Sequence, residues 1–183
     1  MSAAISFGVL TSPAPPWQQV VDNWQRIEEL GLDSVWVPDH FVNLRDPSLP
    51  QLEAWTLLPA LASQTTRIRV GSLVSAIPFR NPAFLARQAL TVDHISQGRM
   101  ELGLGTGAAG SMDASYAMAG IEDWSFAERV ARFQEVVEII DQLLSNEVSS
   151  YDGQFYKLQE TQMTPRPIQR PRIPLTIAAH GPK

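Results

Sequence analysis

Residues 67–107, RIRVGSLVSAIPFRNPAFLARQALTVDHISQGRMELGLGTG, decide the fold because they combine a strand, a helix and a second strand in one run. Residues 67–76, in which Ile68, Val70 and Val74 are β-branched, predict a strand. Asn81 as N-cap and Pro82 in the first turn predict the start of a helix, and Gly98 predicts its end. The remainder predicts another strand that runs into glycines. Strand, crossover helix and strand form the unit from which parallel sheets are built.

The same alternation continues on both sides of this unit. Apolar runs predict strands at residues 3–10, 34–41 and 170–181, and apolar residues spaced three or four apart predict helices at residues 17–30, 52–64 and 125–144. An Asp152-Gly153 turn between the last helix and the last strand predicts a β-hairpin. The pattern therefore predicts a parallel α/β fold, either an open doubly wound sheet or the first part of an eight-stranded barrel.

The length of the chain bears on the choice between these folds. A complete barrel of this type takes about 250 residues, whereas this chain has 183. We interpret residues 1–183 as a single domain that holds about the first five strands of a (β/α)8 barrel and is truncated. An incomplete barrel leaves an unpaired edge strand and apolar helix faces, so we expect a homodimer or another form of self-association.

The composition excludes several classes of protein. The formal net charge is −5, 44% of the residues are hydrophobic and cysteine is absent. The charges form no basic run for nucleic acid, and no apolar run approaches the roughly 20 residues of a membrane helix. The three histidines lie far apart in the sequence and match no metal-ligand spacing. We expect a cytoplasmic protein that acts on a small molecule, with no nucleic acid, membrane or metal as partner.

The sequence SVWVPDHF, residues 34–41, places an acid and an imidazole at the end of a predicted strand. Pro38 ends that strand, so Asp39 and His40 lie at its C-terminal tip, where parallel barrels carry their active sites. Adjacent residues of an extended chain face opposite sides, so we expect one toward the barrel mouth and the other toward supporting structure. An imidazole can give or take a proton near neutral pH. The alternative is structural, with Asp39 capping the next loop and His40 packed on the rim.

Residues 105–110, GTGAAG, fit the dinucleotide-binding pattern G-x-G-x-x-G in an unsuitable context. That fingerprint opens a helix in the first strand–helix turn, whereas this segment follows a later strand and leads into an irregular stretch. Glycines after a parallel strand can still expose backbone N–H groups to a phosphate or a planar ring. The alternative is a tight turn that binds nothing.

Several segments together resemble the luciferase-like monooxygenase family, bacterial luciferase and relatives that use flavin or the deazaflavin coenzyme F420. They are EELGLDSVWVPDHF, residues 67–107, the long helix with its hairpin, and PRPIQRPRIPLTIAAHGPK. The resemblance implies a (β/α)8 barrel with the cofactor at the C-terminal ends of the strands. It also implies that this chain corresponds to the N-terminal half to two thirds of a family member.

The resemblance assigns roles to particular residues. Deazaflavin-using relatives carry an Asp-His pair at this place that contacts the cofactor, which makes His40 and Asp39 the candidate catalytic residues. Candidate cofactor contacts come from Asp39 and from the later strand ends, namely Val74, Ser75, Gly105, Thr106, Gly107, Ala179 and Gly181. The family also tends to have a non-proline cis peptide bond in the neighbourhood of residues 73–75.

Two departures from the family restrict the expected substrate. Relatives that oxidise a sugar phosphate with deazaflavin carry Trp four residues after the His and Glu directly after Gly-Thr-Gly. Leu44 and Ala108 occupy these positions here. A sugar phosphate is therefore not the expected substrate.

The resemblance implies an oxidoreductase that transfers a hydride to or from coenzyme F420, an 8-hydroxy-5-deazaflavin. The alternative within the enzyme class is an FMN-dependent monooxygenase that uses O2. Because a deazaflavin lacks the ring nitrogen that reacts with oxygen, the identity of the cofactor separates the two chemistries. Outside the enzyme class, the alternative is a shortened flavin-binding or structural derivative without activity.

Overall fold

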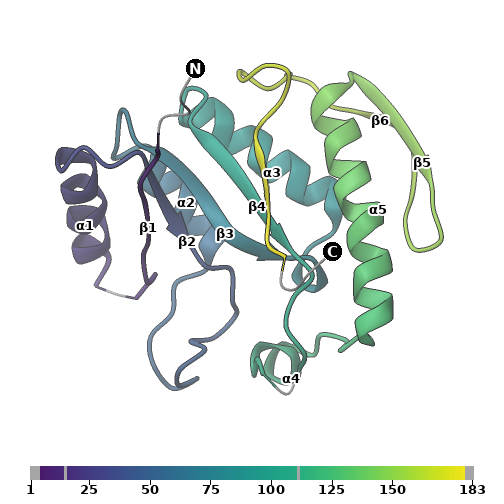
Figure 1. The fold of residues 1–183 in the computed structure, drawn as a ribbon, viewed down its shortest axis with the longest axis horizontal. Coiled ribbons are helices and arrows are strands. Elements are labelled where there is room, and N and C mark those ends of the chain that lie inside the picture. The colour runs from purple at the N-terminus through teal and green to yellow at the C-terminus, as the bar shows by residue number, and fades with distance from the viewer. Residues whose placement is uncertain (1–4, 15, 111, 180–183) are drawn as a thin grey trace.

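The computed structural model describes residues 5–14, 16–110 and 112–179, which form a parallel sheet with helices along one side (Figure 1). The elements in chain order are β1 (Gly8–Leu10), α1 (Trp17–Glu29), β2 (Ser34–Val37), α2 (Ala54–Ala62), β3 (Arg69–Ala76), a short 3-10 helix η1 (Ile77–Phe79), α3 (Pro82–Ile95), β4 (Met100–Gly105), α4 (Ser115–Ala119), α5 (Phe126–Ser145), β5 (Val148–Asp152), β6 (Lys157–Gln162) and β7 (Leu175–Ile177).

The order of the strands identifies the architecture. The five-stranded sheet runs β1-β2-β3-β4-β7, and every neighbouring pair is parallel. A doubly wound sheet reverses its strand order and carries helices on both faces. Here the order is consecutive, and in the described part of the chain no helix lies in front of the strands in Figure 1. Consecutive parallel strands with helices outside match the beginning of a barrel.

The expected helices begin at the residues that the sequence marks. Asn81 accepts hydrogen bonds from the N–H groups of the first turn of α3, and Ser125 does the same for α5. Glu53 caps α2, which contains Pro59. Short polar or acidic side chains at these three positions supply the acceptors that the first turn of a helix lacks.

The two outer strands are shorter than the sequence predicts. The expected strand 3–10 pairs only at Gly8–Leu10, and the expected strand 170–181 pairs only at Leu175–Ile177. In the second case Pro171 and Pro174 lack the N–H group that a strand donates to its neighbour. The predicted hairpin is present as β5 and β6, with a four-residue connection rather than a tight turn at Asp152-Gly153.

The core lies between the sheet and the helices that cover its outer side. The largest fully buried side chains come from α1, α2, α3, α5 and the strands between them, and they include Trp24, Leu58, Leu61, Leu90, Leu102 and Ile140. Among the described helices, none has both the length and the apolar character needed to cross a membrane.

Strand β3 bulges toward β4, and the glycines of β4 provide the space. The register between these strands shifts between Ser72 and Ser75. A Cβ added to Gly103 would lie under 3.0 Å from the backbone carbonyl oxygen of Ser72, and one added to Gly105 would lie 2.6 Å from a methyl group of Val74. The glycines in GLG therefore allow the two backbones to approach each other.

We expect Gly103→Ala to destabilise the protein by about 3 to 4 kcal/mol, because the new methyl group meets a backbone oxygen that cannot move without disturbing the sheet. Chemical denaturation followed by circular dichroism measures this loss.

Gly120→Ala is the control for this substitution. Gly120 has φ +65° and open space around its Cβ position, so its substitution should cost only the roughly 1 to 2 kcal/mol of a left-handed alanine. If the two variants lose the same free energy of unfolding, the contact between residue 103 and the carbonyl oxygen of Ser72 does not account for the loss at Gly103.

The unpaired edges of the sheet generate a second prediction. Within the described residues, β1 pairs only with β2 and β7 only with β4, and Leu10 on β1 is 52% exposed. We expect this chain to form dimers or larger assemblies at micromolar concentration, as seen by sedimentation velocity. Leu10→Lys should weaken association, whereas Leu30→Lys, at a similarly exposed leucine after α1, should not. A wild-type chain that stays monomeric would contradict the prediction.

Candidate functional site

The C-terminal ends of the parallel strands bring most of the predicted site residues to one edge of the sheet. Asp39 and His40 follow β2, Val74 and Ser75 lie in the last half of β3, and Gly105 ends β4. Thr106 and Gly107 continue from β4, and Ala179 follows β7 and is exposed. The predicted contact at Gly181 lies outside the described residues.

Asp39 points into the protein and binds Arg80. Its side chain is 3% exposed, and its two carboxylate oxygens accept hydrogen bonds of 2.7 Å from Nε and Nη2 of Arg80. This two-point geometry is the strongest form of a carboxylate–guanidinium pair. Asp39 therefore joins the end of β2 to the segment between β3 and α3, and its carboxylate faces away from the strand-tip surface.

Arg80 has further partners on α2. Its Nη2 atom donates to Glu53 at 2.5 Å, and its guanidinium lies 5.8 Å from the ring centre of Trp55. Burial raises the pKa of Glu53, but hydrogen bonds from Thr56, Trp55 and Arg80 outweigh it, so the net shift of that pKa is downward. Both acids bound by Arg80 thus compensate its buried charge.

His40 points the other way and binds an acid that is distant in the sequence. The Nδ1 atom of His40 lies 2.9 Å from Oδ2 of Asp113, and the two residues are 73 positions apart. The His40 side chain is 23% exposed, whereas Asp113 is 2% exposed. The two adjacent residues therefore have different partners, Arg80 for Asp39 and Asp113 for His40.

Ser115 connects the same two loops through the backbone. Its hydroxyl oxygen accepts hydrogen bonds from the N–H groups of Phe41 at 3.2 Å and Val42 at 3.3 Å. Its own N–H donates to Oδ1 of Asp113 at 2.8 Å. The loop after β4 therefore holds both the side chain of His40 and the backbone that follows it.

The bulge of β3 contains the cis peptide bond expected in this neighbourhood, between Leu73 and Val74. Val74 is half-buried, with its methyl groups beside Gly103 and Gly105. Ser75 is completely buried, and its hydroxyl accepts from Nε1 of Trp55 at 2.9 Å and donates to Ser72 at 3.0 Å. Of the two predicted contacts on β3, only Val74 has surface at the strand tips in this structure.

The glycine turn after β4 is tightly surrounded. Gly107 has φ +78°, and a side chain there would meet the hydroxyl of Tyr116 and the ring of Pro78. Arg129 from α5 donates to the carbonyl oxygen of Ala108. Among the described residues, the buried side-chain atoms Oη of Tyr116, Nε1 of Trp124 and Nε of Arg129 have no hydrogen-bond partner. Burial raises the pKa of Tyr116 in spite of the nearby Arg129, so this hydroxyl is neutral at neutral pH.

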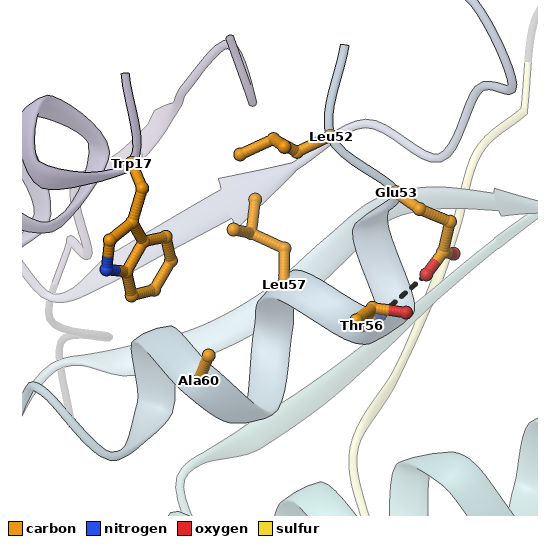
Figure 2. Close-up of a pocket in the computed structure, with 6 residues that line it drawn as sticks. All are labelled: Trp17, Leu52, Glu53, Thr56, Leu57 and Ala60. Carbon is orange, nitrogen blue, oxygen red and sulfur yellow. Dashed lines mark hydrogen bonds between the residues drawn. The ribbon is translucent and has the colours of Figure 1, made fainter. Parts of the chain in front are cut away.

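A shallow apolar groove lies elsewhere, between α1 and α2 on the outer side of the sheet (Figure 2). Its volume is about 390 Å³, and it is lined by Trp17, Leu52, Glu53, Thr56, Leu57 and Ala60. Neither His40 nor the glycine turn contributes to it. The predicted site residues lie at the strand tips and not in this groove.

Two residues of the site were missed by reasoning from the sequence. Arg80 directly precedes the helix cap Asn81, and that position carried no functional signal. Asp113 lies in a stretch without regular periodicity, so nothing in the sequence connected it to His40. In the described residues, no group of three or more His, Asp or Glu side chains is arranged to hold a metal ion.

Comparison with known proteins shows relatives along nearly all of the chain. The F420-dependent glucose-6-phosphate dehydrogenase of Amycolatopsis mediterranei is 38% identical over 168 residues, which is 90% of this chain and 48% of the relative. The enzyme of the same name from Kineococcus radiotolerans is 38% identical over 158 residues, 85% of this chain and 44% of the relative. The chain thus spans about half the length of the curated relatives it matches.

Solved structures share the fold. An F420-dependent secondary alcohol dehydrogenase in complex with an F420–acetone adduct matches with a TM-score of 0.82 at 23% identity, over 94% of this chain and 51% of that chain. Monooxygenase RslO1 from Streptomyces bottropensis matches with a TM-score of 0.77 at 26% identity, over 94% and 53%. These matches confirm the expected partial barrel.

The family model described as luciferase-like monooxygenase matches residues 2–183. With the consecutive parallel strands and the residues gathered at their tips, this match shows that the chain belongs to the luciferase-like monooxygenase family.

Proposed function

We propose that this chain forms part of the active site of an oxidoreductase that transfers a hydride to or from coenzyme F420. The observation that carries the proposal is His40, which is held through Nδ1 at the strand tips, while its Nε2 has no hydrogen-bond partner among the described residues. Support also comes from relatives at 38% identity that are named as F420-dependent enzymes.

The residues at the strand tips fit the planar ring of a deazaflavin. Val74 offers a half-buried apolar surface beside Gly105, and the turn at Gly107 packs against Tyr116 and Pro78. The imidazole of His40 stands at the neighbouring strand end. When bound, coenzyme F420 would supply the centre that accepts or donates the hydride.

Within this proposal the residues of the chain have distinct tasks. His40 takes a proton from a substrate hydroxyl group as the hydride leaves, or returns it in the reverse direction. Asp39, bound to Arg80, fixes the end of β2 on which His40 stands. Gly105, Thr106 and Gly107 provide backbone groups to the cofactor, and Ala179 borders it from β7.

We further propose that the substrate is not glucose 6-phosphate. Leu44 and Ala108 replace the aromatic and acidic residues of sugar-phosphate-oxidising relatives, and Leu44 is 52% exposed. These changes remove polar and charged groups from the strand-tip surface. A small alcohol or ketone with an apolar body suits these residues better than a sugar phosphate.

Fluorescence titration with coenzyme F420 and with FMN tests the proposed cofactor. We expect saturable binding of F420 and weaker binding of FMN, with His40→Ala reducing the F420 affinity about 5- to 20-fold because a polar contact is lost.

His94→Ala is the matched control for that experiment. His94 lies in the last turn of α3, at the opposite end of the sheet, where Nε2 lies 2.9 Å from the carbonyl oxygen of Arg166. Its substitution should leave cofactor affinity unchanged. Preference for FMN would favour the oxygen-dependent monooxygenase, and binding of neither cofactor would favour a non-catalytic derivative.

A further inference from the structure

Asp113 is a buried acid at the strand tips that the proposed reaction does not yet use. It lies between β4 and α4, and its side chain is 2% exposed. Burying a carboxylate is unfavourable unless its oxygens are satisfied by donors. Both oxygens of Asp113 are satisfied, one by the N–H of Ser115 and the other by the ring of His40.

The carboxylate of Asp113 is fixed in orientation. The N–H of Ser115 holds Oδ1 at 2.8 Å, while the hydroxyl of Ser115 holds the backbone of Phe41 and Val42, which directly follow His40. Acid and imidazole are therefore attached to one another twice, through a side-chain contact and through the backbone. These contacts keep the segment that carries His40 next to the segment that carries Asp113.

Asp113 accepts hydrogen bonds and does not donate them. Burial raises the pKa of Asp113, but the hydrogen bonds from Ser115 and His40 lower that pKa by more, so the acid is ionised at neutral pH. An ionised carboxylate has no proton to give, so Nδ1 of His40 must be the donor in the 2.9 Å contact. In the neutral imidazole, the lone pair then lies on Nε2.

The acid next to His40 in the sequence does not compete for this role. Both oxygens of Asp39 are engaged by Arg80 at 2.7 Å. Asp113 is thus the carboxylate that sets the tautomer of His40.

We propose that Asp113 is a positioning residue that holds neutral His40 with its proton on Nδ1 and leaves Nε2 free to accept a proton at the strand tips. Only one part of this proposal rests on the proposed function, namely that Nε2 accepts a proton from the substrate. The tautomer itself is a property of the chain without any ligand.

Long-range nitrogen–proton NMR on histidine-labelled protein tests the proposal, because it distinguishes protonated from unprotonated ring nitrogens. The spectrum is recorded at about pH 8.5, two units above the ordinary pKa of imidazole, and His40→Ala identifies the signals of His40. We expect the wild type to carry its proton on Nδ1. Asp113→Asn should move the proton to Nε2, because the amide can keep the bond from Ser115 through its oxygen while its NH2 donates to Nδ1.

Ser115→Ala is the matched control. It removes the hydroxyl, which holds the backbone of Phe41 and Val42 and also lowers the pKa of Asp113, but it leaves the carboxylate and the hydrogen bond from the N–H of residue 115. It should reduce thermal stability while the Nδ1–H tautomer persists. Should Asp113→Asn fail to fold, the wild-type and Ser115→Ala spectra still decide the question.

A wild-type His40 protonated on Nε2, or a folded Asp113→Asn variant with an unchanged tautomer, would overturn the proposal. Measuring F420 binding to the same variants tests the proposed cofactor independently of the His40 tautomer. Asp113→Asn leaves the imidazole in place, so its F420 affinity should fall no further than that of His40→Ala, while turnover, where the protein shows it, should fall at least about 100-fold with little change in the KM for the substrate. If His40 shows the expected tautomer but the protein does not bind F420, Asp113 is still a positioning residue and the proposed cofactor is wrong.

Discussion

The close approach of β3 to β4 is the constraint on which the strand-tip surface depends. The backbone oxygen of Ser72 occupies the space that a side chain at Gly103 would need, and Val74 lies against Gly105. The bulge turns Val74 to the strand-tip surface and Ser75 to the interior, where Ser75 joins Trp55 to β4 through Ser72. Close contact between backbones leaves little freedom, so this part of the surface is preformed.

Arg80 binds the end of β2 to this preformed part of the surface. It stands where β3 gives way to α3, and it binds Asp39 and Glu53 from two other elements. A largely buried guanidinium is stable only when acids compensate its charge, and the buried carboxylate of Asp39 in turn depends on the guanidinium. The three residues therefore fix the relative positions of β2, β3 and α2, and they place His40 without touching it.

Local features of the fold were predictable from the sequence, and long-range pairings were not. The strand–helix–strand unit at 67–107 and the caps Asn81 and Ser125 could be predicted because each depends on neighbours in the chain, whereas the cis peptide bond near residues 73–75 was expected only from the family resemblance. The partners of Asp39 and His40 lie 41 and 73 positions away, and a single sequence contains no signal that joins them. The lengths of the outer strands were also overestimated, because pairing with only one neighbour supports fewer hydrogen bonds than apolar character suggests.

The structure shows that Asp39 and Asp113 have different partners, which the sequence alone could not show. Asp39 stands beside His40 in the chain, yet the alternation of an extended backbone directs it to Arg80, which neutralises it. Asp113 is distant in the chain, but the loop after β4 returns to β2 and places it against the imidazole. Asp39 is already bound at both oxygens by a guanidinium and is a poor acceptor for a histidine proton, whereas Asp113 is bound by Ser115 and by the imidazole itself. This division allows one acid to hold the strand ends while the other orients the base.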